Sequence, residues 1–113
     1  MDCLFCKIAA GEIPSTKAYE DELVYAFHDI DPQAPVHILI IPKEHIKSAD
    51  YITAENSSVV AHIFEVAALL AKEYNISEEG YRIVTNIGEA GGQTVKHLHF
   101  HLMGGRDFTW PAG

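Results

Sequence analysis

The spacing of hydrophobic side chains changes along the chain, and each spacing predicts a different element. Over residues 53–74, apolar side chains recur at intervals of four, three and four, which places them on one face of an α-helix. The hydroxyl group of Thr53 can cap the N-terminus of this helix. We expect its buried stripe to consist of Val59, Ile63, Val66 and Leu70.

Shorter apolar stretches predict β-strands. The run 36–41 is apolar and rich in β-branched residues, which is typical of a central strand, and Pro42 ends it. The segments 17–20 and 23–27 flank an acidic turn and predict a hairpin. Two further strands are expected over residues 81–86 and 94–103, and a short helix over residues 4–10.

Strands that follow one another in sequence, together with one dominant helix, predict an α+β fold built on an antiparallel sheet. The chain has 113 residues, which corresponds to one domain spanning residues 1–113. Its hydrophobic content of 48% is enough for a core and excludes intrinsic disorder.

The charge balance excludes several classes of partner. Sixteen acidic residues against eight basic ones give a net charge of −8, which argues against binding to a DNA or RNA backbone. No apolar run reaches the length of about 18 residues that a membrane-spanning helix needs. Residues 1–7 lack the basic start of a signal peptide, and two cysteines are too few for a disulfide scaffold. We therefore expect a cytoplasmic protein with neither nucleic-acid nor membrane partners.

The chain contains seven histidines, and three of them alternate with apolar residues in the last expected strand. Because successive side chains of a strand point to opposite faces, His97, His99 and His101 share one face and the residues between them face the core. Three imidazoles give a sheet no stability that Thr, Lys or Glu would not also give. We therefore interpret this face as functional.

Two chemistries fit three histidines on one face. The first is a metal site, because imidazole is the commonest metal ligand. Same-face neighbours lie about 6.6 Å apart and can converge on one ion, whereas the outer pair, about 13 Å apart, converges poorly and favours a ligand from elsewhere. The second is catalysis, in which one imidazole attacks a substrate while its neighbours hold charge and protons.

The flanking residues favour catalysis on an anionic substrate. Gly91 and Gly92 allow backbone N–H groups to approach an anion closely, and Gln93 and Thr94 add neutral donors. Arg106 lies just beyond the strand. A phosphate-sized anion is therefore the expected occupant. Since no Mg²⁺-binding carboxylate cluster accompanies the glycine loop, metal-free transfer is the simpler scheme.

The segment from His97 to Met103 follows the pattern His-φ-His-φ-His-φ-φ, in which φ is apolar, and it resembles the signature of the histidine triad (HIT) family. Other segments resemble the Hint branch of this family, whose members are nucleotide-binding phosphoramidases related to dinucleotide polyphosphate hydrolases. These segments are 27–35, 41–45, 91–94 and 104–111, so the resemblance covers nearly the whole chain. It implies a five-stranded antiparallel sheet with one long and one short helix, paired in a homodimer.

The resemblance also implies catalytic roles. His99 matches the nucleophile that attacks the α-phosphorus and forms a nucleotidyl-histidine intermediate, which water then hydrolyses. His101 matches a residue that contacts the phosphate and can donate a proton to the leaving amine. His97 and His37 support and orient the site, and Thr94 keeps a hydroxyl group for a phosphate oxygen or the leaving group. An imidazole is a nucleophile at neutral pH without activation, whereas Thr94 would need a base.

Nucleotide-binding residues follow from the same resemblance. Asp29 matches the carboxylate that binds the ribose hydroxyls, and Ile30 lines the base pocket. The tail that contains Trp110 matches a segment that reaches across the dimer and helps to form the neighbour's substrate pocket. The expected residues near the phosphate are Asn86, Gly92, Gln93, Thr94, His99 and His101.

Cys3 and Cys6 leave three interpretations open. A redox pair would open the helix of a thioredoxin-like βαβ unit, and no such unit follows. Half of a zinc site would need two further ligands, for which His45 and His97 are the best candidates. The third interpretation is a pair of reduced thiols in a short helix. The resemblance adds that many microbial relatives carry this pair with a bound zinc, and if zinc takes His97, that residue is structural.

The resemblance thus predicts a purine nucleoside phosphoramidase that cleaves the P–N bond of adenosine 5′-phosphoramidate-type substrates. It predicts no cofactor for the reaction itself and leaves a structural zinc open. Two alternatives stay open as well. One is a nucleotide-binding regulatory adaptor whose hydrolysis is incidental, and the other is a metal-dependent hydrolase that uses the histidine strand as ligands.

Overall fold

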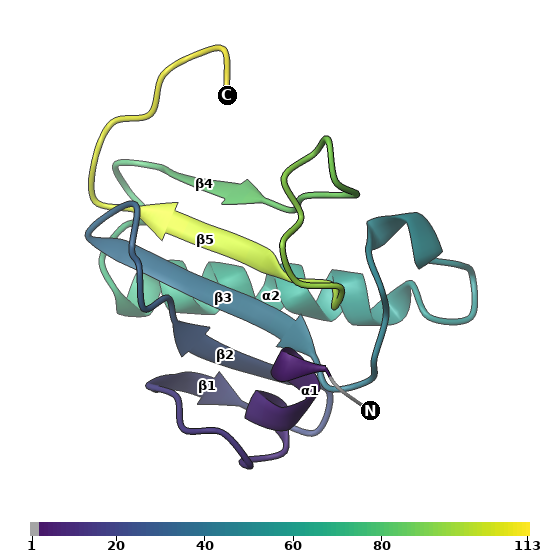
Figure 1. Ribbon diagram of the computed structural model, residues 1–113. Helices are drawn as coiled ribbons and strands as arrows, with labels where there is room; N and C mark the ends of the chain where they lie inside the picture. Colours follow the sequence, from purple (N-terminus) through teal and green to yellow (C-terminus); the bar gives the residue numbers. More distant parts are fainter. Residues whose placement is uncertain (1–2) are drawn as a thin grey trace.

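The computed structural model describes residues 3–113, which form a five-stranded antiparallel sheet with one helix on each face (Figure 1). The strand order is β1-β2-β3-β5-β4. Met1 and Asp2 lie outside the described residues, and one domain over 1–113 stays a prediction. The elements are α1 (Leu4–Ala9), β1 (Lys17–Glu20), β2 (Val24–His28), β3 (Val36–Pro42), a 3-10 helix η1 (Ala49–Tyr51), α2 (Ser58–Glu73), β4 (Tyr81–Val84) and β5 (Phe100–Gly104).

Helix α2 lies across one face of the sheet, and the expected apolar stripe makes the contact (Figure 1). Ile63, Val66 and Leu70 are buried there, and Val59 is partly buried against them. The residues that alternate with the three histidines enter the same core, as the strand pattern predicts. They are Leu98, Phe100 and Leu102.

Helix α1 lies on the opposite face, close to β2 and β3 (Figure 1). Phe5 and Ile8 of this helix pack against apolar side chains of the two strands and form a second, smaller core. His97 and His99 belong to this side and are only 0% and 5% exposed. The histidine face is therefore not a solvated face of the sheet, because α1 covers part of it.

The last strand is shorter than the sequence predicts. Its ladder covers Phe100–Gly104 instead of residues 94–103, and both β3 and β4 pair with it there. The preceding segment is held by other contacts: the Leu98 N–H donates to the Ile46 carbonyl (2.6 Å), and the Thr85 hydroxyl group donates to the carbonyl of His99 (2.8 Å). The side chains continue to alternate, so the segment keeps its two faces without belonging to the sheet.

Helix α2 also begins later than predicted, at Ser58 instead of Thr53. Residues 53–57 form a separate turn, in which the Thr53 hydroxyl group accepts a hydrogen bond from the Glu55 N–H (3.3 Å). The Asn56 side chain accepts the Thr53 N–H in the same turn (2.7 Å). Thr53 therefore caps this turn and not the helix. Within residues 3–113, no helix combines the length and the apolar character needed to cross a membrane.

Candidate active site and metal centre

The backbone fixes the ring of His99. Its Nδ1 lies 2.7 Å from the carbonyl oxygen of His97. A carbonyl can only accept, so the proton sits on Nδ1 and the Nε2 lone pair remains unprotonated. The ring of Phe5 packs on His99 edge to face, with centroids 5.0 Å apart at an angle of 88°. His99 is thus held as a neutral imidazole with one basic nitrogen.

His37 and His101 form a hydrogen-bonded pair whose direction is also determined. The backbone N–H of Gln33 donates to Nδ1 of His37 (3.0 Å), so His37 carries its proton on Nε2. That Nε2–H donates to Nδ1 of His101 (2.8 Å), which leaves the His101 proton on Nε2. The carboxylate of Asp29 lies 3.4 Å from Nε2 of His37. His101 therefore presents an N–H donor at its far nitrogen.

Burial keeps these imidazoles neutral. Desolvation is the main cause that lowers the pKa of His37, His97 and His99 below the ordinary value. The pKa of His101 falls to about 4, first through burial and then through the neighbouring His99 and His37. At neutral pH the group therefore offers one lone pair, on His99, and one N–H donor, on His101.

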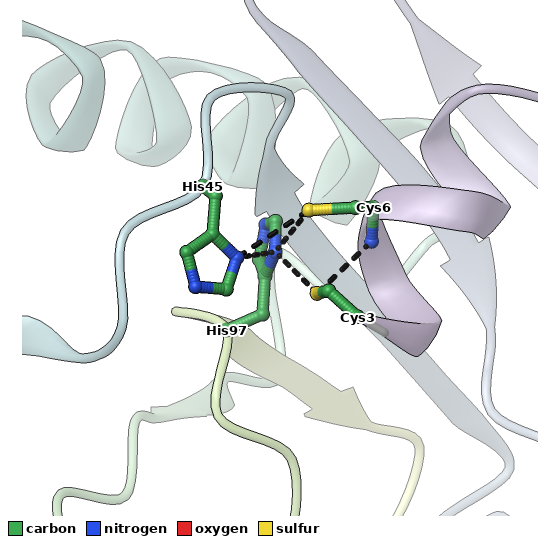
Figure 2. Close-up of side chains that lie close together, drawn as sticks. All are labelled: Cys3, Cys6, His45 and His97. Atoms are coloured by element: carbon green, nitrogen blue, oxygen red, sulfur yellow. Dashed lines mark hydrogen bonds between the residues drawn. The ribbon is translucent and has the colours of Figure 1, made fainter. Parts of the chain in front are cut away.

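His97 faces away from this chemistry. Its Nε2 lies 2.8 Å from the Pro42 carbonyl, so the proton sits on Nε2 and the Nδ1 lone pair points elsewhere. Figure 2 shows where it points: the side chains of Cys3, Cys6, His45 and His97 converge on one another. Nδ1 of His97 lies 3.2 Å from Sγ of Cys3, 3.4 Å from Sγ of Cys6 and 3.2 Å from Nδ1 of His45.

The Cys3–Cys6–His45–His97 cluster fits a tetrahedral metal ion. Zinc bonds of about 2.0–2.1 Å to nitrogen and about 2.3 Å to sulfur give ligand–ligand distances of roughly 3.3–3.8 Å, and the nitrogen–nitrogen and nitrogen–sulfur distances in the cluster are 3.2–3.4 Å. The three close neighbours of the single His97 Nδ1 lone pair cannot all donate to it at once. Burial and then the Cys3 thiol raise the pKa of the Cys6 thiol to about 11. A central cation would satisfy the lone pairs and stabilise both thiolates.

A second group, Asp29, His37 and His101, also brings three ligand atoms within 4.8 Å of one another. Its hydrogen bonds argue against a metal. Nε2 of His37 carries a proton, and that proton cannot move to Nδ1 because the Gln33 N–H already donates there. The hydrogen bonds of this group therefore place protons where a metal would need lone pairs, whereas the Cys3–Cys6–His45–His97 cluster has the donor atoms to hold a cation.

A cavity of about 450 Å³ opens beside His99 and His101 and is large enough for a small ligand. Thr94 and Asp29 line the same cavity as the two histidines. Ile30 stands at its edge and is fully exposed. The rest of the wall is mainly apolar and includes Leu4, Phe5, Ile8, Ile13, Phe27 and Leu39.

Other expected phosphate residues lie elsewhere. Of the described residues, those that line the cavity do not include Asn86, Gly92 or Gln93. The Gln93 amide donates to the carbonyls of Lys47 (2.7 Å) and Val95 (3.0 Å) and accepts the Gly88 N–H (3.0 Å). Its side chain is fully used in holding the glycine loop. The expectation of Gln93 as a spare donor is thereby corrected.

Two residues of the C-terminal segment differ in their surroundings. Trp110 is 85% exposed, so little of its side chain is buried by its own chain. Arg106, which the sequence offers as an anion-binding residue, donates instead to the carbonyls of Gln33 (2.8 Å) and Asp107 (3.0 Å). Its guanidinium group also stacks on Phe108 at 4.2 Å. Arg106 is therefore engaged with the backbone rather than aimed into the cavity.

Sequence reasoning missed two residues of the site. Phe5 lies between the two cysteines and touches His99, which its place in an amphipathic turn does not reveal. Gln33 acts through its backbone N–H, so its side-chain type carries no signal. The only available hint was the short separation between Gln33 and His37 in a proline-containing loop.

Comparisons with known proteins show which proteins this chain is similar to. The chain is 47% identical over 105 residues to the purine nucleoside phosphoramidase of Escherichia coli strain K12, covering 93% of this chain and 88% of that protein. It is 49% identical over 112 residues to an uncharacterized HIT-like protein of Synechococcus elongatus, covering 99% and 97% of the two chains.

Solved structures match as well. The fold superposes with a TM-score of 0.97 on a HIT family hydrolase from Legionella pneumophila, at 52% identity and with 99% of this chain and 100% of that chain covered. A histidine triad protein from Clostridium difficile gives a TM-score of 0.94 at 50% identity, with 96% and 95% covered. The HIT domain profile matches residues 10–108. This chain therefore belongs to the HIT domain family, as the motif from His97 to Met103 predicts.

Proposed function

We propose that this protein is a purine nucleoside phosphoramidase that hydrolyses the P–N bond of adenosine 5′-phosphoramidate-type substrates through a nucleotidyl-His99 intermediate. One observation carries the proposal: the His97 carbonyl holds the Nδ1 proton of His99, so Nε2 is a free nucleophile beside the cavity. The 47% identity to a phosphoramidase from Escherichia coli supports the substrate class.

The reaction has two steps. Nε2 of His99 attacks the α-phosphorus, the P–N bond breaks, and the leaving nitrogen takes the Nε2 proton of His101. Water then attacks phosphorus, the bond to His99 breaks, and the proton that water loses restores His101. Thr94 donates to a phosphate oxygen or to the leaving group, and the N–H groups near the phosphate stabilise the charge that develops there.

The apolar cavity and Asp29 account for nucleoside binding. In this proposal Asp29 accepts the ribose hydroxyls, while Ile30 and the apolar wall bury the base. Asn86 and Gly92 remain proposed phosphate neighbours. Gln93 serves to hold the glycine loop. His37 orients His101.

The proposal includes a structural zinc held by Cys3, Cys6, His45 and His97 and a homodimer in which Trp110 reaches the partner's pocket. Zinc would close helix α1 onto the sheet, and the chemistry would need no metal. The thiolates must stay reduced to bind it, which fits the cytoplasm. The exposed Trp110 supports the dimer, because a large aromatic side chain gains stability when it finds a partner.

The test is turnover of a panel of nucleoside phosphoramidates by EDTA-treated and untreated protein, with mass spectrometry of quenched reactions. We expect purine substrates to turn over in both samples and a nucleotidyl adduct to form on His99. An adduct on His97 or His101 contradicts the assignment. Activity that disappears with the chelator and returns with metal would establish the metal-dependent hydrolase instead. Tight nucleotide binding without turnover would establish the adaptor.

A further inference from the structure

The proton on His101 depends on a residue that does not touch the reacting groups. His101 keeps its N–H on Nε2 only because His37 donates to its Nδ1, and His37 can donate only because the Gln33 N–H occupies its other nitrogen. A contact that fixes the backbone of Gln33 therefore also fixes the direction of the hydrogen bond between His37 and His101.

Gln33 is also held through its carbonyl group, by Arg106. The guanidinium Nε–H donates to the Gln33 carbonyl (2.8 Å), and an Nη1–H donates to the carbonyl of Asp107 (3.0 Å). Gln33 thus has its N–H on His37 and its C=O on Arg106. The same two segments also lie close together at Gly105, where an added Cβ would lie 2.9 Å from Cβ of Pro35.

Arg106 also contacts the first residues of the tail. Phe108 lies between two guanidinium groups, with Arg106 at 4.2 Å and Arg82 at 5.1 Å from its ring centroid. Arg82 donates to the Thr109 carbonyl (3.0 Å). Arg82 and Arg106 therefore both hold Phe108, but of the two only Arg106 is bonded to Gln33.

We propose that Arg106 is a positioning residue for proton donation. By bonding to the Gln33 carbonyl, it holds the backbone whose N–H fixes the proton of His37 on Nε2, and so keeps an N–H donor on His101. This inference rests on the proposed phosphoramidase reaction. It assigns Arg106 a role other than anion binding and links the base of the C-terminal tail to the group that protonates the leaving nitrogen.

The role has a signature that a general structural defect lacks. A strongly basic alkylamine cannot leave from phosphorus without a proton, whereas p-nitrophenolate leaves readily without one. Loss of the donor geometry should therefore slow a nucleoside 5′-alkylphosphoramidate much more than the matching nucleoside 5′-(p-nitrophenyl phosphate). A general fold defect would slow both substrates alike.

The experiment compares Arg106→Gln, Arg106→Lys and Arg82→Met on these two substrates. We expect Arg106→Gln to lower kcat for the alkylphosphoramidate about three- to tenfold, the value of one hydrogen bond, with less than about twofold change for the p-nitrophenyl ester and in KM. Arg106→Lys should recover part of the loss. Arg82→Met, which disturbs Phe108 but not Gln33, should leave the ratio between the two substrates unchanged.

Equal loss on both substrates, or no loss in Arg106→Gln, overturns the inference. A second measurement keeps it independent of the proposed function. In ¹⁵N NMR of the imidazoles, the wild type should show His37 protonated on Nε2, and Arg106→Gln should show a mixture of tautomers. If the wild type turns over no phosphoramidate, the proposed function fails while NMR still decides the role of Arg106. An unchanged tautomer in Arg106→Gln rejects that role.

Discussion

The two ends of the histidine segment carry the same residue type and face the same side of the sheet, yet one ring presents a lone pair and the other presents an N–H donor. At one end, the Pro42 carbonyl takes the Nε2 proton of His97, and the free lone pair points into a group of thiols. At the other end, His37 supplies a proton to Nδ1 of His101, which leaves an N–H donor. The backbone groups around each ring determine which nitrogen keeps a lone pair.

His99, between the two ends, combines features of both. Like His97 it gives one proton to a carbonyl, and like His101 it lines the cavity. It is therefore the one member with both a lone pair and access to a ligand. Spacing alone treats the three residues as equivalent, whereas the hydrogen bonds make one of them a proposed nucleophile, one a proposed proton donor and one a candidate metal ligand.

The largest effect is expected from removing the middle residue. His99→Ala should lower kcat by about 10⁴-fold or more, because neither His97 nor His101 offers a lone pair to the cavity. Nucleotide binding should persist, since Asp29 and the apolar wall remain. Steady-state kinetics and calorimetric titration with a nucleoside monophosphate measure the two properties. Near-normal turnover by His99→Ala would show that the middle position has no special role.

The fold was largely predictable because it depends on local periodicity. The alternation around His99 correctly placed Leu98, Phe100 and Leu102 in the core, and the four-three-four spacing correctly placed the stripe of α2. The length of the last strand was not predictable in this way. Alternation shows that a segment is extended, but it does not show whether a neighbouring strand is there to pair with it, and the pairing of β3 with β5 ends at Ile40 and Phe100.

The residue types of the site could be predicted, but the directions of its hydrogen bonds could not. The motif indicated His37, His99, His101 and Asp29, and the structure brings all four together. It could not indicate which ring nitrogen carries a proton, because the deciding groups are backbone atoms of Pro42 and Gln33. Periodicity and side-chain chemistry say nothing about such contacts, which arise only when the chain has folded.

The second prediction tests whether the metal ligands at the His97 end contribute to stability and not to the reaction. Cys3→Ser/Cys6→Ser should abolish zinc binding and lower the melting temperature by at least about 5 °C, while kcat stays within about tenfold. His45→Gln is the matched control, because it removes a ligand without altering helix α1. Elemental analysis, thermal denaturation and kinetics supply the readouts. Protein purified without chelator that contains no zinc would end the metal interpretation, and loss of all activity at unchanged stability would move the metal into the reaction.

The third prediction concerns the tail that leaves the sheet beyond the His101 end. Chains that lack residues 108–113 should lose about tenfold in discrimination between substrates, because Trp110 of the partner would no longer contribute to the pocket. A mixed dimer tests this directly. When truncated chains are paired with inactive His99→Ala chains, the intact His99 should regain full selectivity from the other chain's tail. Selectivity that stays at the level of the truncated homodimer would mean that each tail serves its own subunit.

The smallest expected effect is on the pH dependence of folding stability, whose sign differs between His101 and His62. The pKa of His101 is about 4 in the folded chain and about 6.5 in an unfolded one, so the unfolded state binds more protons between these values. Stability linked to His101 is therefore complete above about pH 6.5 and is lost as the pH falls toward 4. His62 behaves in the opposite way, because its hydrogen bond to Asp21 (2.6 Å) raises its pKa.

Stability linked to His62 is present below about pH 6.5 and is lost as the pH rises through the raised value. Melting temperatures of His101→Gln and His62→Gln across pH 4.5–9 test both signs. Between pH 7 and 4.5, His101→Gln should lose about 3–5 °C less than the wild type does, since it lacks a group that resists protonation. His62→Gln should fall below the wild type at pH 5.5 and match it at pH 9. If both variants changed with pH in the same direction, burial would not be what sets the pKa of His101, and the proposed neutral donor would lose its physical basis.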